Sequence, residues 1–315
     1  MRQRWRWAIA LLAFGLGVLV AYLSAGDRGL SLAGMEETQP TVSSVAETIA
    51  PSPTLEAPMY EQRVLEFSTV HILKIPGNSS WEVRPLVADS LKILNEFATD
   101  SGAIAVINGG YFDPVNQQTT SFISQNGAII ADPQDNDRLM DNPDLTPYLP
   151  KILNRSEFRR YQCGGEITYA IARHNDSIPE DCQLADALGA GPRLLPHLTA
   201  EDEGFVEVVD GVVVRDAIGT TTPNARSAIG ITEHGDLVWL IVAQRPDLDS
   251  PTGMTLAEVS DMLRSLNVTD ALNLDGGSSS SLWHNGTRYY GKLNDAQEWI
   301  DRSVKSALIL DVSTP

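Results

Sequence analysis

Short runs of β-branched and aliphatic residues, separated by turn sequences, dominate the hydrophobic pattern beyond about residue 60. Residues 70–75 and 81–87 are two such runs, and the turn sequence Pro76-Gly77-Asn78 lies between them. Other apolar stretches flank four more turn sequences: Asn126-Gly127, Asp210-Gly211, His234-Gly235-Asp236 and Asn285-Gly286. Asn-Gly and Asp-Gly favour type I′ hairpin turns, because both central residues of such a turn need a positive φ. The pattern therefore predicts antiparallel pairing and argues against a purely parallel, doubly wound sheet.

Two segments show helical spacing instead. In residues 90–99 the apolar side chains recur at positions 91, 94 and 97, and in residues 255–266 at positions 256, 259, 263 and 266. Helices that alternate with hairpins are typical of the α+β class. We predict a single α+β domain over residues 60–315, built on a mixed, largely antiparallel β-sheet with packed helices.

The first 59 residues follow a different pattern. Arg2, Arg4 and Arg6 precede residues 8–25, which carry no charge. This order is typical of a signal anchor or a signal peptide with its positive end inside the cell. Residues 1–26 are interpreted in this way, and residues 27–59 as a disordered linker rich in Ser, Thr and Pro. We expect an exported protein on the cell-envelope side of the cytoplasmic membrane, which residues 8–25 anchor if they are not cleaved.

Charge and cysteine content narrow the functional classes. The formal net charge of −18 argues against a nucleic-acid partner, because contact with a phosphate backbone needs a basic face. A small substrate that carries phosphate stays open, since the charge of the whole chain says little about one cleft. Cys163 and Cys182 would be incidental thiols in the cytosol, but in an exported protein they predict a disulfide across a long excursion of the chain.

Two strand ends carry the residues that point to chemistry. Residues 103–107 form a buried-strand run that ends in Asn108-Gly109-Gly110 and, three residues later, Asp113. Residues 270–274 form a second run, in which Asn273 shares a face with Asp275, and Gly276-Gly277-Ser278 follows. A carboxylate beside glycine N–H groups and hydroxyls is suited to binding an anion or a sugar. The alternatives are a tight turn at the first strand end and a solvated Ser/Gly loop at the second.

Three further residues are candidates with an equally simple structural explanation. Arg193 and Arg226 lie in turn sequences, where an arginine can bind a phosphate or form a surface ion pair. Glu258 is a candidate catalytic carboxylate, but Thr255-Leu256-Ala257-Glu258 also fits a capping box at the start of a helix. The five histidines show no spacing typical of metal ligands. No cofactor is predicted, and nothing in the sequence supports a divalent cation.

Several of these segments occur together in one order. They are Asn108 to Phe112, Ala190 to Leu195, Arg226 to Gly230, Gly253 to Glu258 and Leu272 to Ser280, with Arg302 to Ala307 near the end. This series resembles the phosphodiester glycosidase family over roughly residues 103–310. There are two departures. Ser278 stands where the family usually has a third glycine, and Gln244-Arg245-Pro246 stands where it often has Asp-Gly-Arg.

The resemblance implies a hydrolase that cleaves a glycosyl phosphodiester and so releases a phosphomonoester. In that reaction Arg226 and Arg193 are expected to bind the phosphate, assisted by the backbone of Gly276, Gly277 and Ser278. Asp275 would be the base or would stabilise an oxocarbenium ion, and Asn108 and Asp113 would bind sugar hydroxyls. Two alternatives remain at this stage: a non-catalytic protein that binds cell-envelope glycan, and an exopolysaccharide assembly protein.

Overall fold

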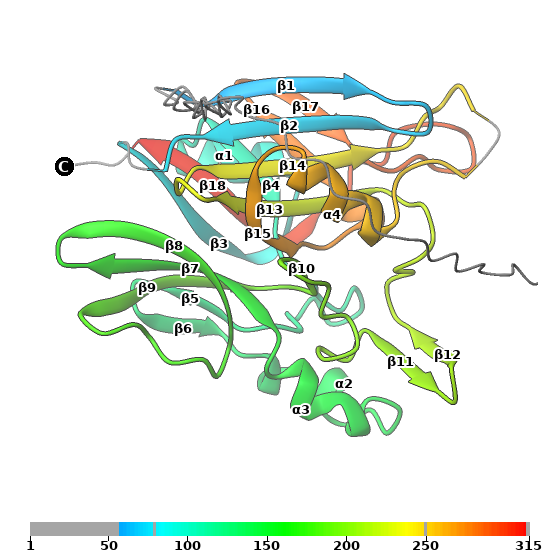
Figure 1. Cartoon of the computed structure of the whole chain (residues 1–315), viewed down its shortest axis with the longest axis horizontal. Coiled ribbons are helices and arrows are strands. Elements are labelled where there is room, and N and C mark those ends of the chain that lie inside the picture. The colour runs from blue at the N-terminus through cyan, green and yellow to red at the C-terminus, as the bar shows by residue number, and fades with distance from the viewer. Residues whose placement is uncertain (1–56, 78–79, 249–250, 313–315) are drawn as a thin grey trace, which may run out of the picture. The chain divides into compact units, whose positions relative to one another are not determined.

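Hairpin-linked strands form most of the folded part of the chain (Figure 1). The structure is a computed structural model that describes residues 57–77, 80–248 and 251–312. The expected anchor, residues 1–26, and the linker up to residue 56 lie outside these residues. None of the described helices is long and apolar enough to cross a membrane. The first described strand, β1, begins at Met59, one residue before the expected start of the domain.

The first sheet contains six strands in the order β1-β2-β14-β13-β15-β10. Every residue of β14 is buried, and its sequence Leu-Val-Trp-Leu-Ile-Val-Ala has the continuous apolar character of a strand that is covered on both faces. One face packs on helix α4 and the other packs on the second sheet. The bounds are Met59–Val64 (β1), Thr69–Ile75 (β2), Leu237–Ala243 (β14), Arg226–Thr232 (β13), Val268–Asn273 (β15), Arg193–Leu195 (β10) and Leu256–Arg264 (α4).

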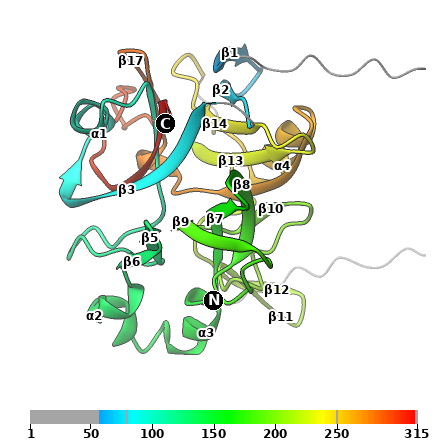
Figure 2. The same ribbon diagram turned by 90° about the vertical axis from the view of Figure 1, so that its left-hand side faces the viewer.

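The second sheet contains five strands in the order β17-β16-β4-β18-β3. Its inner face shares one hydrophobic core with the first sheet, and helix α1 packs on its outer face. Figure 2 shows the resulting layers, with α1 and α4 on opposite outer sides of the two sheets. The bounds are Thr287–Tyr290 (β17), Ser281–His284 (β16), Ala105–Asn108 (β4), Val304–Val312 (β18), Trp81–Lys92 (β3) and Leu94–Ser101 (α1).

The helix expected over residues 90–99 begins later than its apolar spacing predicts. Residues 90–92 still belong to β3, and Lys92 lies opposite Val304 of β18. Ile93 has an extended backbone and its N–H donates to the carboxylate of Glu96, so the helix starts at Leu94. The runs at residues 70–75 and 81–87 are both strands, but they pair in different sheets rather than with each other.

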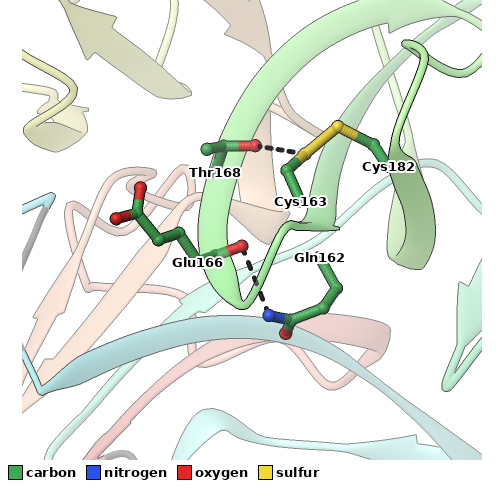
Figure 3. The surroundings of a disulfide bond; sticks show 5 residues. All are labelled: Gln162, Cys163, Glu166, Thr168 and Cys182. Carbon is green, nitrogen blue, oxygen red and sulfur yellow. Dashed lines mark hydrogen bonds between the residues drawn. A yellow bond between two sulfur atoms is a disulfide. The ribbon is translucent and has the colours of Figure 1, made fainter.

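A third sheet carries the two cysteines. Its order is β6-β5-β9-β7-β8, and Cys163 at the end of β7 lies directly opposite Cys182 at the start of β9. The two are joined by a disulfide, as predicted (Figure 3). The bounds are Ala128–Ala131 (β6), Ile123–Gln125 (β5), Cys182–Gly189 (β9), Ser156–Cys163 (β7) and Glu166–Arg173 (β8).

Short elements complete the fold. The helical ones are η1 (Pro133–Asp135), α2 (Asp137–Met140), η2 (Thr146–Tyr148), α3 (Leu149–Ile152) and η3 (Gly277–Ser279). A separate hairpin pairs β11 (Val206–Val209) with β12 (Val212–Asp216).

The turn predictions are confirmed at all four hairpins. They join β5 to β6, β11 to β12, β13 to β14 and β16 to β17. Asn-Gly and Asp-Gly adopt positive φ at both residues, with φ of 51° and 77° at Asp210 and Gly211. The described residues all belong to one compact unit, in agreement with a single domain. The architecture is mostly antiparallel with few helices, and no parallel pair occurs among the described strands, in contrast to the mixed sheet expected.

Candidate active site

Asn108 joins the two facing sheets at the point where both predicted strand ends meet. Its Nδ2 donates to the backbone carbonyl of Asp275 at 2.6 Å, and its Oδ1 accepts from the Ser227 hydroxyl at 2.7 Å. Oδ1 also accepts from the N–H of Ser281 at 3.2 Å. The residue is fully buried. Its side chain therefore holds the Asp275 loop in place and has no hydrogen-bonding group left for a sugar.

Asp275 lies two residues beyond the end of β15, where its N–H donates to the Gly109 carbonyl at 3.0 Å. Burial raises the pKa of its carboxyl group to about 6, although the Ser279 hydroxyl, the Arg302 cation and the Gly276 N–H act in the opposite direction. A carboxyl group with such a pKa exchanges its proton close to neutral pH, as a catalytic acid or base must. The loop thus carries a carboxyl group with altered acidity.

Arg302 supplies positive charge to this loop. Its Nη1 donates to the Ser278 hydroxyl at 3.0 Å, and its guanidinium lies 5.4 Å from the centre of the Phe112 ring. No carboxylate is ion-paired with Arg302 within 4 Å among the described residues. The cation therefore keeps donors for a further anionic group beside Asp275.

Tyr111 and Asn273 form the other side of the site. Asn273 Nδ2 donates to the Tyr111 hydroxyl at 2.7 Å and to the Gly191 carbonyl at 3.1 Å, and the Tyr111 hydroxyl donates to the same carbonyl at 2.8 Å. Burial and the Asp275 carboxylate raise the pKa of Tyr111. Asn273 Oδ1 is buried and has no partner among the described residues. A buried acceptor without a donor is costly, so this oxygen is available for a hydroxyl group of a ligand.

The glycines at positions 109 and 110 allow the backbone to pack closely. A Cβ on Gly109 would lie 2.5 Å from the Ser306 hydroxyl oxygen, and a Cβ on Gly110 would lie 2.2 Å from the Gly189 carbonyl oxygen. Gly277 has a φ of +60° and its N–H donates to the Ala225 carbonyl at 2.8 Å, so it shapes the turn after Asp275. Gly276 and Ser278 are partly exposed beside Asp275.

Arg226 is a structural clamp in this fold. Its guanidinium is buried and donates only to backbone carbonyls. They are those of Met254 at 3.0 Å, Ile218 at 2.9 Å, Gly219 at 2.6 Å and Thr222 at 2.8 Å. These bonds hold the chain behind Gly276, whose own Cβ position would lie 3.9 Å from Arg226 Cδ. Arg226 is thus near the Asp275 loop, but its donors serve the backbone.

The side chains of the other predicted residues bind partners other than Asp275. Arg193 forms a bidentate ion pair with Asp270, with bonds of 2.8 and 2.7 Å. Asp113 accepts from Arg138 at 2.7 Å. Glu258 is exposed and forms the capping box of α4, accepting from the Thr255 N–H at 2.8 Å. The structure therefore brings together Asn108, Asn273, Asp275 and the following loop, but does not bring these three residues to them.

The family model for phosphodiester glycosidase matches residues 101–310, which is about two thirds of the chain. The chain belongs to the phosphodiester glycosidase family. No curated protein matches the sequence significantly.

Solved structures share the phosphodiester glycosidase fold at low sequence identity. The catalytic domain of zebrafish N-acetylglucosamine-1-phosphodiester alpha-N-acetylglucosaminidase, auto-inhibited by pro-peptide, has a TM-score of 0.56 and 17% identity, over 82% of this chain and 84% of that one. A hypothetical protein from Synechocystis has a TM-score of 0.56 and 18% identity over 81% of this chain. The match spans 62% of the Synechocystis chain.

Two residues of this phosphodiester glycosidase domain were not assigned a role from the sequence. Tyr111 lies inside the first shared motif, and Arg302 begins the last one. Position within a motif was the available signal, but only the fold shows that both side chains approach Asp275. Among the described residues, no group of three or more His, Cys, Asp and Glu side chains is arranged to hold a metal ion.

Proposed function

We propose that this protein is an exported hydrolase that cleaves the bond between the anomeric carbon of a sugar and a phosphodiester. The observation that carries the proposal is the Asp275 carboxylate, which lies close to the Arg302 cation. Burial raises its pKa to about 6, although Arg302 acts to lower it. Membership of the phosphodiester glycosidase family supports the reaction class. The charge-free segment at residues 8–25 supports export and anchoring.

Asp275 and Arg302 have separate roles in the proposed reaction. Water attacks the anomeric carbon, its proton passes to the Asp275 carboxylate, and the bond from that carbon to the phosphate oxygen breaks. The electron pair leaves with the phosphate, which becomes a phosphomonoester. Such a leaving group is stable as an anion and needs less protonation than an alcohol does. Arg302 stabilises the negative charge that develops on it.

Asn273 gives the site its sugar contact. Its unpartnered Oδ1 accepts a hydroxyl of the sugar, while its Nδ2 is held by Tyr111 and Gly191. The Gly276-Gly277-Ser278 backbone follows Asp275 directly and lies on the Arg302 side of the site. We therefore expect the sugar to contact Asn273 and Asp275, and its phosphate to lie within reach of Arg302.

The test is a panel of sugar-1-phosphodiesters, including nucleotide sugars and teichoic-type polymers, incubated with the full chain. Phosphorus NMR detects the phosphomonoester, and a reducing-end assay detects the free sugar. Asp275→Asn should lower turnover by at least about 100-fold and Arg302→Met by about 10-fold or more. Arg288→Met is the matched control, because Arg288 also lies near an aromatic ring, Tyr290 at 5.7 Å, but at an exposed position paired with Asp301.

Full turnover by folded Asp275→Asn would refute the assignment of the base. Tight glycan binding without any product from any substrate would instead favour the non-catalytic alternative.

A further inference from the structure

Arg155 is a buried cation with almost no hydrogen-bond partners. Its Nε donates to the Glu203 carbonyl at 3.1 Å, and its guanidinium carbon lies 3.7 Å above the centre of the Phe205 ring. Among the described residues, Nη1 and Nη2 have no hydrogen-bond partner and no ion pair. The residue is only 8% exposed, but Nη1 and Nη2 are not closed off from solvent, so a ligand can reach them.

Other buried arginines of the fold show how unusual this is. Arg226 makes four hydrogen bonds to carbonyls, and Arg159 reaches Glu157, the Tyr161 hydroxyl and three carbonyls. Structural arginines here are therefore saturated. Arg155 uses one N–H and leaves the fork of its guanidinium unused.

Glu203 does not account for Arg155 as its counterion. The Glu203 carboxylate is fully buried and already accepts from the Ser156 N–H, the Ser156 hydroxyl, the Thr199 hydroxyl and the Arg193 N–H. It is near enough to favour the charged form of Arg155, yet burial still lowers the pKa of Arg155 to about 10. Arg215 is a second cation that also lowers this pKa, so Arg155 and Arg215 share one carboxylate and there is room for one more anion.

The position of Arg155 connects it with the proposed catalytic site. Phe205, on which it stacks, lies 5.5 Å from the Tyr111 ring, centroid to centroid. The Tyr111 hydroxyl donates to the Gly191 carbonyl and accepts from Asn273. The charges of Asp275 and Arg155 both act on the pKa of the Tyr111 hydroxyl: Asp275 raises it and Arg155 lowers it. Arg155 therefore lies on the Tyr111 side of the site, whereas Arg302 contacts the Ser278 side.

We propose that Arg155 is an anion ligand of this site, and that its two Nη groups bind the phosphate oxygens of the substrate and then of the released phosphomonoester. A guanidinium presents parallel N–H donors that match two oxygens of one phosphate. The stacking on Phe205 fixes the plane of the fork before the ligand arrives. The identity of the anion as substrate phosphate rests on the proposed function, but anion binding itself does not.

Binding of inorganic phosphate to the full chain, measured by calorimetry, tests the inference without need of turnover. Arg155→Met should weaken phosphate binding at least 10-fold, and Arg155→Lys should weaken it less because the charge is kept. The matched control is Arg288→Met, since Arg288 also lies near an aromatic ring, Tyr290 at 5.7 Å, but does not act on the pKa of Arg155. The control should bind phosphate within 2-fold of the wild type.

The inference is overturned if the wild type does not bind phosphate, or if folded Arg155→Met binds it as tightly as the wild type does. If phosphate binding depends on Arg155 but no sugar phosphodiester is hydrolysed, the anion site stands and the proposed function fails. If Asp275→Asn abolishes hydrolysis but Arg155→Met leaves phosphate binding unchanged, the anion site is refuted and the proposed function is not.

Circular dichroism shows whether Arg155→Met folds. If it does not, crystals of the wild-type protein soaked in tungstate give the answer through anomalous scattering. A tungsten peak within hydrogen-bond reach of Nη1 or Nη2 is expected. A peak only elsewhere, or none, overturns the proposal.

Discussion

Replacement of Asp275 by Asn should abolish activity and at the same time stabilise the protein. The Asp275 loop is partly exposed, but burial of the carboxyl group is the main reason that its pKa rises from 3.8 to about 6. Ionisation of this carboxyl group is therefore less favourable in the folded state than in the unfolded chain, which lowers the free energy of unfolding. Asn has nearly the same shape and carries no charge, so the variant avoids this cost but loses the proposed base.

The size and pH dependence follow from the shift. One pKa unit corresponds to about 1.4 kcal/mol, so a rise from 3.8 to about 6 gives at most about 3 kcal/mol. Because the pKa is higher in the folded state, the wild type loses stability as pH rises from about 4 to about 6 and keeps that loss above it. We expect Asp275→Asn to be more stable by about 1–3 kcal/mol at pH 7.5, and by little at pH 4.

Urea unfolding followed by tryptophan fluorescence at the two pH values measures this difference. Asp113→Asn is a control of opposite sign. Burial acts to raise the pKa of Asp113, but the Val115 N–H and Arg138 outweigh it and lower that pKa. That variant should lose stability at pH 7.5 and recover relative to the wild type as pH falls. The reasoning is refuted if Asp275→Asn is no more stable than the wild type at pH 7.5, or if its advantage persists at pH 4.

Three further predictions concern the site and other parts of the structure. Asn108→Ala should lower the free energy of unfolding by about 3–5 kcal/mol and remove most of the activity, because three buried groups lose their partner. Asn136 has a comparable buried amide outside the site. Asn136→Ala should therefore lower stability in urea unfolding but leave kcat unchanged in the folded fraction. Glu258→Ala should lower the free energy of unfolding by about 1 kcal/mol and change kcat less than about 2-fold, as loss of a helix cap does; a large loss of kcat would restore its catalytic candidacy. Joint replacement of Cys163 and Cys182 by Ser should cost about 3 kcal/mol in thermal unfolding, and reductant should then have no further effect on the variant. Equal unfolding of the oxidised wild type and the double variant would contradict that expectation.

Local chemistry made much of the fold predictable. An Asn-Gly or Asp-Gly turn needs positive φ at two residues and a few strand residues on each side, so its signal is complete within a short stretch of sequence. The capping box at Thr255 and Glu258 is equally local, and it appears in the structure as expected. The helix start at Leu94 was misplaced because the pairing of Lys92 with Val304 extends β3, and these residues are far apart in sequence.

The site was only partly predictable for the same reason. Asp275, Asn273 and Asn108 follow strands, and strand ends are visible as patterns. The role of Arg226 depends on four carbonyls from residues 218–254, whose convergence no local pattern reports. Arg155 lies in no motif, and its unused donors become visible only when the neighbours of every buried arginine are compared.

Asn108 has a consequence for the nascent chain. The hydrogen bonds of its side-chain amide reach Ser227, Asp275 and Ser281, the last of them 173 residues further along the sequence. Until Ser281 has left the ribosome, Asn108 cannot complete this set of hydrogen bonds. We therefore expect the site to form only when most of the polypeptide has been synthesised and folded.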